Sequence, residues 1–374
     1  MQYLLAIETS CDDTSVALIR GQDLSPQTPI SKHSPFEVLY FKSFSQEYML
    51  KAWGGVVPEI AARNHLDKIF PLLAEAMKLA QITYQNLSCI AVTQGPGLLG
   101  PLLTGINTAK ALSLSYKLPL LGVNHLFAHV EAIHFDQQVC YPYLGCVISG
   151  GHTFFALVES STEWKFLGST VDDALGEALD KGGKLLGLAY PAGKYMDRLS
   201  TFGKSNQYTF PLGMSFDKQS CKVSYSGIKN ALRVLCEKNP HFLKEKPTSL
   251  EQFEATSQNY YDLIASYMNA CFDTLIQKIP MAYQLAQSIN SQVDHRTPLV
   301  FGGGVAMSTM LQKKIKKLSY TSYFVSPELC TDNALMIATL AWKNKEHKTL
   351  YPQSLTLDAF SRYIDRKNQA WQNS

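Results

Sequence analysis

Residues 143–159, YLGCVISGGHTFFALVE, predict a β-hairpin with a glycine-containing turn. The apolar runs on either side of Ser149-Gly150-Gly151-His152-Thr153 are typical of buried strands, and the glycines allow the tight reversal between them. A second hairpin is expected near the N-terminus, where strands at 3–7 and 15–20 flank a polar turn. The chain therefore contains two hairpins around which similar segments could be built.

The segments that follow the two hairpins repeat one order of elements. In each, a strand leads through a glycine-containing turn (94–97 and 302–304) into a helix, and a further strand then leads through a loop into a second helix. Two duplicated α/β halves around a central cleft are the architecture of the actin-like ATPase (ASKHA) fold. We expect halves at 1–142 and 143–374, with a large helical insertion at 160–297, and the helix 334–343 could pack back on the first half.

Composition indicates a globular protein and little more. The chain has 374 residues, 46% of them hydrophobic and 17% charged, and its net charge of +3 neither indicates nor excludes a nucleic-acid partner. No apolar run reaches the roughly 18 residues that span a bilayer. The N-terminus lacks the basic region of a signal peptide, and the eight cysteines include no CxxC pair. We therefore expect a cytoplasmic protein with reduced thiols and no membrane association.

The first half carries a pair of histidines with metal-ligand spacing. His125 and His129 lie four residues apart, which places both imidazoles on one face of a helix. Alone, this pattern more often marks two structural histidines that bond to carbonyl groups. The repeat, however, matches their helix to the helix that opens at Asp332, and would set the two ligand groups facing each other across the cleft. Two imidazoles and one carboxylate leave positions open for water or substrate, as in a catalytic metal site.

Several catalytic motifs are absent from the sequence. The chain has no Walker A motif, no GxSxG and no GxGxxG after a strand. Leu126 stands where a zincin protease has its glutamate base. Residues 171–188 predict a helix in the insertion, on which Asp173, Glu177 and Asp180 share one face.

Nine blocks of the sequence, spread over nearly the whole chain, resemble the TsaD (Gcp/YgjD, KAE-type) family. The resemblance does not extend to the loop 21–36. The blocks are AIETSCDDTSVAL, GGVVPEIAARNH, TQGPGLLGPLLTG, NHLFAH, ISGGHT, DDALGEALDKGGKLLGLAYPAG, SYSGIKNAL, GGGVAMSTML and PELCTDNALMIA.

The resemblance implies an acyltransferase that works in tRNA modification. It would transfer the threonylcarbamoyl group from threonylcarbamoyl-AMP to N6 of adenosine 37 in tRNAs that read ANN codons, forming t6A. The implied cofactor is one divalent metal per subunit, iron(2+) first and zinc as the alternative. The implied protein partners are a TsaB-like paralogue and a TsaE-like P-loop ATPase.

The resemblance also implies roles for individual residues. His125, His129 and Asp332 would be the metal ligands. The family has an asparagine at the position of Ser308, and because the serine hydroxyl is shorter, we expect a weaker contact there. No catalytic residue is assigned, but Glu8 and Asp13 are candidates for a base. The implied substrate-binding residues are Val147, Ile148, Ser149, Gly150, Gly151, Asp180, Gly193, Asp197 and Ser308.

Three other functions stay open at this point. An actin-fold kinase or ATPase for a small molecule would share the hairpins but would not need the histidines. A metalloprotease is what an older name of the family implies. A third alternative is a non-catalytic scaffold in a tRNA-modifying assembly.

Overall fold

The computed structural model describes residues 1–21, 36–50, 53, 55–244 and 257–362. Residues 22–35, most of the predicted loop 21–36, lie outside this described part. Within it, each helix is too short or too polar to cross a membrane. The chain packs as two compact units: unit 1 comprises Met1–Tyr143, Val158–Lys165 and Val325–Ser374, and unit 2 comprises Leu144–Leu157 and Phe166–Phe324.

Unit 1 is built on a five-stranded mixed sheet with the order β3-β2-β1-β4-β5. Strand β2 is antiparallel to β1 and β3, whereas β4 is parallel to β1 and β5. The central strands β1 and β4 are apolar on both faces because both faces of the sheet are covered. The strands are β1 (Gln2–Glu8), β2 (Asp13–Gly21), β3 (Phe36–Ser45), β4 (Cys89–Gly95) and β5 (Leu120–Asn124).

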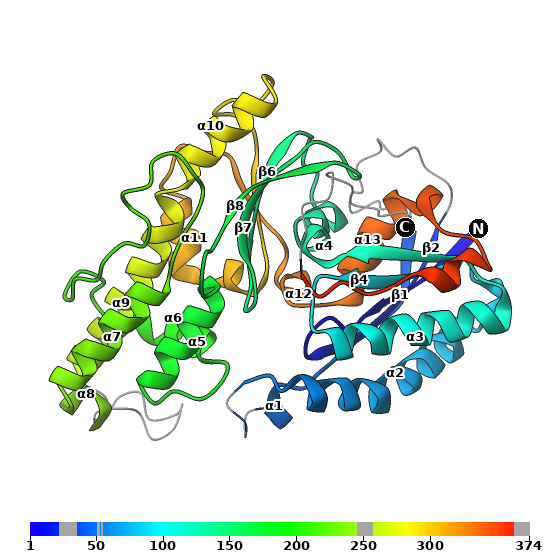
Figure 1. The fold of residues 1–374 in the computed structure, drawn as a ribbon, viewed down its shortest axis with the longest axis horizontal. Coiled ribbons are helices and arrows are strands. Elements are labelled where there is room, and N and C mark those ends of the chain that lie inside the picture. Colours follow the sequence, from blue (N-terminus) through cyan, green and yellow to red (C-terminus); the bar gives the residue numbers. More distant parts are fainter. Residues whose placement is uncertain (22–35, 51–52, 54, 245–256, 363–374) are drawn as a thin grey trace. The chain divides into compact units, whose positions relative to one another are not determined.

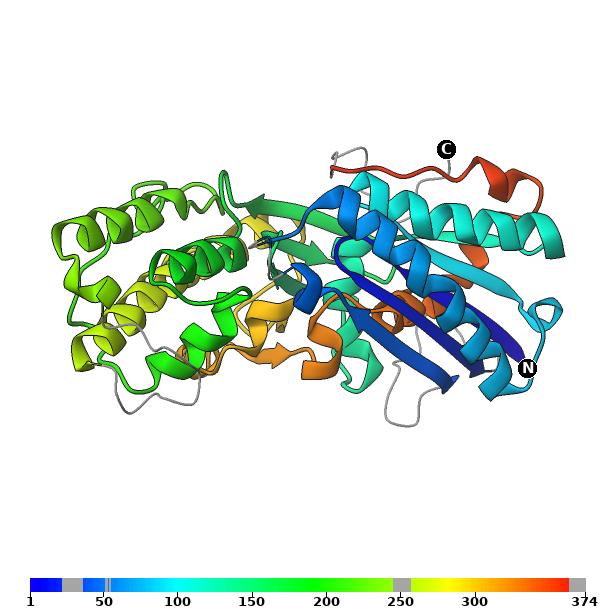
Figure 2. The ribbon, with the colours of Figure 1, turned by 90° about the horizontal axis from the view of Figure 1, so that it is seen from below.

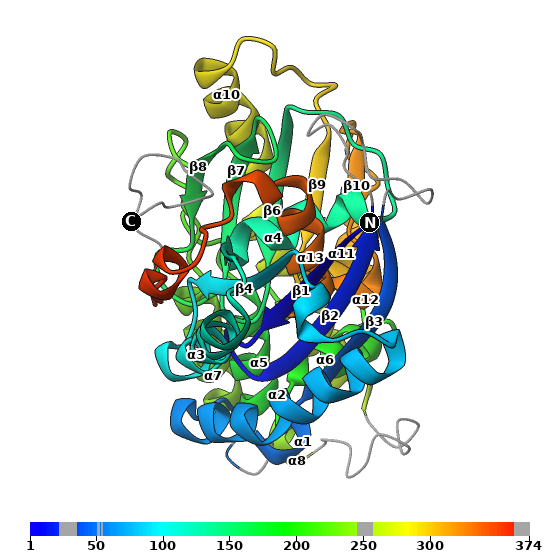
Figure 3. The ribbon, with the colours of Figure 1, turned by 90° about the vertical axis from the view of Figure 1, so that its right-hand side faces the viewer.

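Helices cover the two faces of this sheet in separate layers. Helices α2 (Pro58–Ala80) and α3 (Leu99–Tyr116) lie on one face, and α13 (Ala334–Lys343) lies on the other (Figures 1 and 2). Figure 3 shows the same layers from the side. Leu5 and Ile7 of β1 form one core with residues of α2 and α3. The remaining elements of unit 1 are α1 (Glu47–Leu50), η2 (Tyr84–Asn86), α4 (His125–Glu131), η3 (Ala132–Phe135), α12 (Pro327–Cys330), η6 (Lys345–His347) and η7 (Gln353–Thr356).

Unit 2 contains the second five-stranded sheet, in the order β10-β9-β6-β7-β8. Strand β9 is parallel to β6 and β10. The largely buried helix α9 packs against α5, α6, α7 and α11. The strands are β6 (Tyr143–Ile148), β7 (Thr153–Val158), β8 (Trp164–Ser169), β9 (Leu299–Gly302) and β10 (Ser322–Phe324). The helices are α5 (Leu175–Leu185), α6 (Ala192–Ser200), α7 (Ser226–Lys238), α8 (His241–Lys244), α9 (Gln258–Ile276), α10 (Ile279–Ile289), η5 (Gly304–Met307) and α11 (Thr309–Ile315).

The two sheets have the same internal order. Three consecutive strands, β1-β2-β3 or β6-β7-β8, lie beside two strands from later in the chain, β4-β5 or β9-β10. This order confirms the predicted duplicated α/β fold. The predicted boundary at residue 142 separates the two duplicated segments of the sequence, and this boundary stays a prediction. Helix α13 belongs to unit 1, where it packs on β1, β2 and α4.

The helix predicted at 171–188 is shorter in the structure. Asp172 is not helical, and its carboxylate accepts hydrogen bonds from the N–H groups of Tyr225 (2.8 Å) and Ser226 (3.3 Å) at the start of α7. Helix α5 therefore begins at Leu175, and Asp173 lies outside it instead of sharing a helix face with Asp180. Strand β8 and helix α6 were not predicted.

Candidate functional site

Two asparagine caps place the candidate metal ligands at the starts of α4 and α13. The Asn124 side chain accepts a hydrogen bond from Phe127 N (3.1 Å), so that His125 is the first residue of α4. The Asn333 side chain does the same for α13, accepting from Met336 N (2.9 Å). Asp332 directly precedes this second cap. The three predicted ligands thus lie at or within one turn of a helix start.

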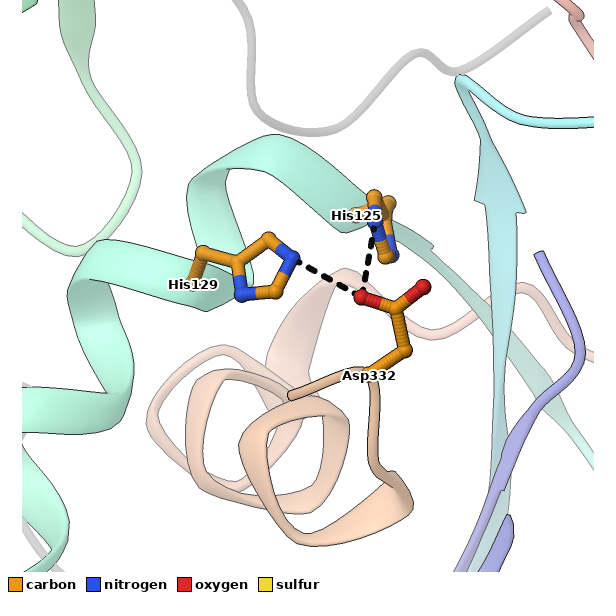
Figure 4. Close-up of side chains that lie close together, drawn as sticks. All are labelled: His125, His129 and Asp332. Carbon is orange, nitrogen blue, oxygen red and sulfur yellow. Dashed lines mark ion pairs between the residues drawn. The ribbon is translucent and has the colours of Figure 1, made fainter. Parts of the chain in front are cut away.

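The structure brings His125, His129 and Asp332 together (Figure 4). Oδ1 of Asp332 lies 3.1 Å from Nε2 of His129 and 3.6 Å from Nε2 of His125. One nitrogen or oxygen atom from each residue lies within 4.8 Å of the others. Both histidines are buried, whereas the Asp332 side chain is 20% exposed. The cluster is therefore accessible from the side of its carboxylate.

The Glu8 carboxylate fixes the ring of His125. Nδ1 of His125 lies 3.2 Å from Oε2 of Glu8, and since an ionised carboxylate only accepts, Nδ1 carries the proton. Oε2 also accepts from the Thr93 hydroxyl at 2.6 Å, and Oε1 accepts from Ser10 N at 2.5 Å. Nε2 of His125 is thereby left for a ligand on the side of Asp332, an arrangement common for metal-bound histidines.

Nearby charges and burial shift the pKa of His125 in opposite directions. Burial disfavours the charged ring, but the carboxylates of Asp332 and Glu8 outweigh burial and raise the pKa of His125 to about 9. A positive charge is therefore favoured where the three side chains meet. A metal ion would be attracted by the same two carboxylates and would compete with the proton for Nε2 of His125.

His129 provides the test of whether this cluster fits a metal. Both of its ring nitrogens are buried, and neither has a hydrogen-bond partner among the described residues. Buried imidazole nitrogens are normally bonded, so two unsatisfied ones need an explanation. A cation between the imidazoles and Asp332 would satisfy Nε2 of His129. The residues present form a possible metal site.

One expectation about this cluster is wrong. The repeat suggested that the histidines and Asp332 would face each other across a cleft between the halves. All three belong to unit 1 instead. The reason is that α13 is apolar around its whole surface and is buried against the first sheet, which brings Asp332 beside α4.

The acidic turn after β1 lies beside the cluster. Burial, followed by the carboxylates of Asp12 and Asp332, raises the pKa of Asp13 to about 8. Burial and Asp332 raise the pKa of Asp12 to about 6. Oδ1 of Asp13 is buried without a hydrogen-bond partner among the described residues, whereas both oxygens of Glu8 are occupied. Of the two predicted bases, Asp13 thus has a carboxylate oxygen without a hydrogen-bond partner among the described residues, and Glu8 bonds to His125.

In unit 2, the predicted glycine turn has room for a ligand. Ser149 and His152 close the turn through the bonds Ser149 N to His152 O (2.8 Å) and His152 N to Ser149 Oγ (3.1 Å). A Cβ atom added to Gly150 or Gly151 would meet nothing within 4 Å. Val147 and Ile148, in contrast, are fully buried in β6, so only their backbone could contribute to binding.

Two further glycines pack tightly against this turn. A Cβ atom on Gly176, in α5, would lie 2.6 Å from the carbonyl oxygen of Ser149. One on Gly303, which has a φ of +90°, would lie 2.7 Å from the carbonyl oxygen of Ile148. The hairpin turn, the start of α5 and the turn after β9 therefore converge at one place.

The other predicted binding residues form two internal pairs. Oδ1 of Asp180 accepts a hydrogen bond from Gly193 N at 3.0 Å. The Asp197 carboxylate accepts from the Ser308 hydroxyl (2.5 Å) and from Thr309 N (2.9 Å) at the start of α11. The Ser308 hydroxyl in turn accepts from Leu311 N (3.2 Å), which splits the helix expected after the glycine turn 302–304 into η5 and α11.

Sequence reasoning missed the residues that support the metal cluster. Ser10 and Thr93 hold Glu8, while Asn124 and Asn333 fix the ligands at the starts of their helices. The asparagines had a recognisable signal, because each directly precedes an apolar helical segment. Thr93 had none, since its bond to Glu8 depends on the pairing of β1 with the distant strand β4, whereas Ser10 holds Glu8 through a local bond of the turn after β1.

Comparison with known proteins identifies relatives over most of the chain. A family model described as "TsaD: tRNA N6-adenosine threonylcarbamoyltransferase" matches residues 37–339. A protein of that name from Trichlorobacter lovleyi is 38% identical over 90% of this chain and 89% of its own length. One from Thermosipho africanus is 37% identical over 95% and 96%, and one from Wolbachia pipientis wMel is 34% identical over 90% and 91%.

Solved structures agree with the fold. HypF from T. kodakarensis matches with a TM-score of 0.55 over 95% of this chain and 49% of its own, at 13% sequence identity. A full-length HypF in a phosphate- and nucleotide-bound form gives a TM-score of 0.53, with coverages of 92% and 46%. At these identities the likeness concerns the actin-like fold alone.

Proposed function

Because this chain belongs to the TsaD family of tRNA N6-adenosine threonylcarbamoyltransferases, we propose that it forms t6A from threonylcarbamoyl-AMP. The acceptor is N6 of adenosine 37 in tRNAs that read ANN codons. N6 attacks the carbamoyl carbon, the bond from that carbon to the phosphate oxygen breaks, and AMP leaves with the bond electrons. The N6 proton passes to a base. The observation that carries the proposal is the family match together with the His125/His129/Asp332 cluster.

The proposed metal ligands are His125, His129 and Asp332, which would hold one divalent ion per subunit. Such an ion supplies Lewis acidity toward the oxygens of the donor. Two imidazoles and a carboxylate suit iron(2+), our first expectation, and also zinc. The two unsatisfied nitrogens of His129 and the orienting bond from Glu8 to His125 support this assignment.

The proposed donor site is the glycine turn of unit 2. The N–H groups of Gly150 and Gly151 would bind a phosphate oxygen, and the open space at both glycines supports such an approach. The N–H of Ser149, also a predicted binding residue, already donates to His152 O, so Ser149 would shape the turn and offer its hydroxyl group. Asp180 and Gly193 would contact the sugar or threonyl part. Asp197 already accepts hydrogen bonds from Ser308 and from the start of α11. Because the Ser308 hydroxyl already donates to Asp197, its contact with the donor would be weaker than that of the family's asparagine.

Asp13 is the base that the contacts favour. Its Oδ1 atom is buried and lacks a hydrogen-bond partner among the described residues, so this oxygen is available to accept a proton. Glu8 would hold His125 in the tautomer that leaves Nε2 unprotonated.

The proposed setting is a multi-protein complex in the cytoplasm, where tRNA is modified. Its members would be this chain, a TsaB-like paralogue and a TsaE-like P-loop ATPase. The motif resemblance along the chain supports these partners.

Direct quantification of t6A tests the proposed function. Unmodified tRNA is incubated with the chain, the two partners, iron(2+) or zinc and threonylcarbamoyl-AMP, and t6A nucleosides are measured by mass spectrometry. We expect t6A only in tRNAs that read ANN codons. Phosphorylation of a small molecule without t6A would favour the kinase alternative, and cleavage of a protein substrate would favour the protease.

Replacement of the open glycines tests the donor site. Gly150→Ala should leave the fold intact, because its Cβ meets nothing within 4 Å, but should weaken donor binding by at least tenfold. Gly227→Ala, at another open glycine of unit 2, is the matched control and should bind the donor normally. Equal binding by both variants would contradict the phosphate cradle.

A further inference from the structure

The two segments that carry the candidate metal ligands meet a second time, at a buried ion pair. Lys343 is the last residue of α13, and Glu131 is the last residue of α4; Nζ lies 3.3 Å from Oε2. Glu131 is fully buried, and Lys343 is 7% exposed. With a rise of about 1.5 Å per residue, roughly 15 Å of helix separates this pair from Asp332. Helix α4 is therefore attached to the Asp332–α13 segment at two distant points.

Two tyrosine hydroxyls complete the surroundings of this pair. Tyr143 donates to Oε1 of Glu131 at 2.5 Å, and Tyr141 donates to Oε2 at 2.8 Å. Lys343 also donates to the Tyr141 hydroxyl oxygen at 2.9 Å. Both carboxylate oxygens thus have donors, as an ionised group in a low dielectric requires. We call these four residues the Glu131 cluster.

The cluster restricts how α4 can pack on α13. A buried charge that loses its partner is costly, so packings that separate Glu131 from Lys343 are disfavoured. At the ligand end, Nε2 of His129 lies 3.1 Å from Oδ1 of Asp332 but makes no hydrogen bond within the described residues, whereas both oxygens of Glu131 accept hydrogen bonds. His129 and Glu131 lie two residues apart on the short helix α4, so a rotation that moved one would move the other.

Taking the proposed metal site as the premise, we propose that the Glu131 cluster positions His125 and His129 against Asp332. Its residues touch neither the metal nor the substrate. They hold the two ligand-bearing segments in the one orientation that brings the three ligands together before the ion arrives. Metal affinity therefore depends on a pair that lies outside the metal site.

Metal binding to the isolated full-length chain tests this role. Zn²⁺ affinity is measured by competition with a chromophoric chelator, and Co²⁺ is used as a spectroscopic probe through its d–d absorption. Lys343→Met removes the ammonium group and keeps an unbranched side chain that is one heavy atom shorter. We expect Lys343→Met to bind Zn²⁺ at least tenfold more weakly than wild type, with a shifted or weakened Co²⁺ band. Both are measured well below the unfolding temperature of each variant.

The matched control is Ser113→Ala, which removes another buried polar group of unit 1. Ser113 is fully buried and bonds to Leu118 O (2.6 Å) and Ser354 Oγ (2.8 Å), with no contact to α4 or α13 among these bonds. It should lose stability but bind both ions normally. If Lys343→Met does not fold, Tyr143→Phe replaces it and should bind Zn²⁺ at least threefold more weakly.

The outcomes separate this proposal from the metal site on which it rests. In one outcome, wild type binds the ions and Asp332→Ala does not, but Lys343→Met or Tyr143→Phe keeps the wild-type affinity and Co²⁺ spectrum. This outcome would refute the positioning role and leave the metal site standing. A wild-type chain that binds neither ion would refute both. If Lys343→Met and Ser113→Ala both bind the ions more weakly, and to the same extent, the Glu131 cluster only stabilises the fold. This outcome would also refute the positioning role.

Discussion

At the scale of single residues, three buried histidines close in sequence have three different environments. His125 bonds to Glu8, His129 has two unsatisfied nitrogens, and His134 has two as well but lies 3.7 Å from Glu131. The HxxxH spacing placed the first two on one helix face, and the repeat and the family resemblance were needed to predict them as ligands. It could not show that Glu8, from a distant strand, selects the tautomer of His125.

The bond between Glu8 and His125 predicts the effect of a neutral replacement. Glu8→Gln can still occupy the same space, but the amide no longer provides the charge that holds Nδ1–H. We expect metal affinity to fall by about 10–100-fold, the usual cost of losing such an orienting group. Chelator competition measures it. Glu75→Gln, the same change at an exposed pair with Lys42, is the control and should have no effect; equal affinities for both variants would refute the orienting role.

His134 predicts part of the pH dependence of stability. Burial lowers its pKa from 6.5 to about 4. Below pH 6.5 the unfolded chain therefore takes up a proton that the folded chain does not, and the free energy of unfolding decreases as the pH falls. Between pH 7 and pH 5 this should amount to about 2 kcal/mol.

The variant His134→Phe keeps a ring between Tyr141 and Tyr143 and removes the titration. Urea unfolding at both pH values should show about 2 kcal/mol less acid destabilisation in the variant than in wild type. Identical pH slopes would mean that His134 is protonated in the folded protein, contrary to its buried environment.

At the scale of elements, the sequence predicted that the strands and long helices exist but did not predict where each one ends. The helix expected after the glycine turn 94–97 is observed as α3. The start of α5 was wrong because Asp172 bonds to α7, which lies far along the chain. The split at Ser308 was missed because its hydroxyl acts as a cap that depends on Asp197. Local patterns identify elements, whereas tertiary hydrogen bonds decide where they begin.

In the turn after β9, alanine substitutions at two adjacent glycines should have different effects on stability. Gly303 has a φ of +90° and no room for a Cβ atom, whereas Gly304 has open space. Gly303→Ala should lower the free energy of unfolding by on the order of 1–3 kcal/mol. Gly304→Ala should change it by less than about 1 kcal/mol. Denaturant unfolding measures both, and similar values for the two would contradict the close packing of this turn on Ile148.

At the scale of the whole molecule, the duplicated fold was predictable and the assembly of the metal cluster was not. Two hairpins, each followed by the same order of elements, were enough to indicate two related sheets. The symmetry selected Asp332 correctly as a neighbour of the histidines, but it set them on facing halves, whereas all three belong to unit 1, on whose sheet helix 334–343 packs back as the sequence allowed. Only tertiary packing shows that α13 is buried in unit 1, because its apolar sequence fits any covered sheet.

The central claim is that the cluster of His125, His129 and Asp332 binds a metal that threonylcarbamoyl transfer requires. It is tested most directly by the rate at which labelled threonine enters unmodified tRNA in the complete mixture, compared between wild type and Asp332→Ala, with bound metal measured in the same samples. Asp67→Ala, which removes an exposed carboxylate of α2, is the control. We expect Asp332→Ala to lose the metal and at least 100-fold in rate while it still unfolds cooperatively, and Asp67→Ala to match wild type. Full activity of Asp332→Ala would contradict the claim.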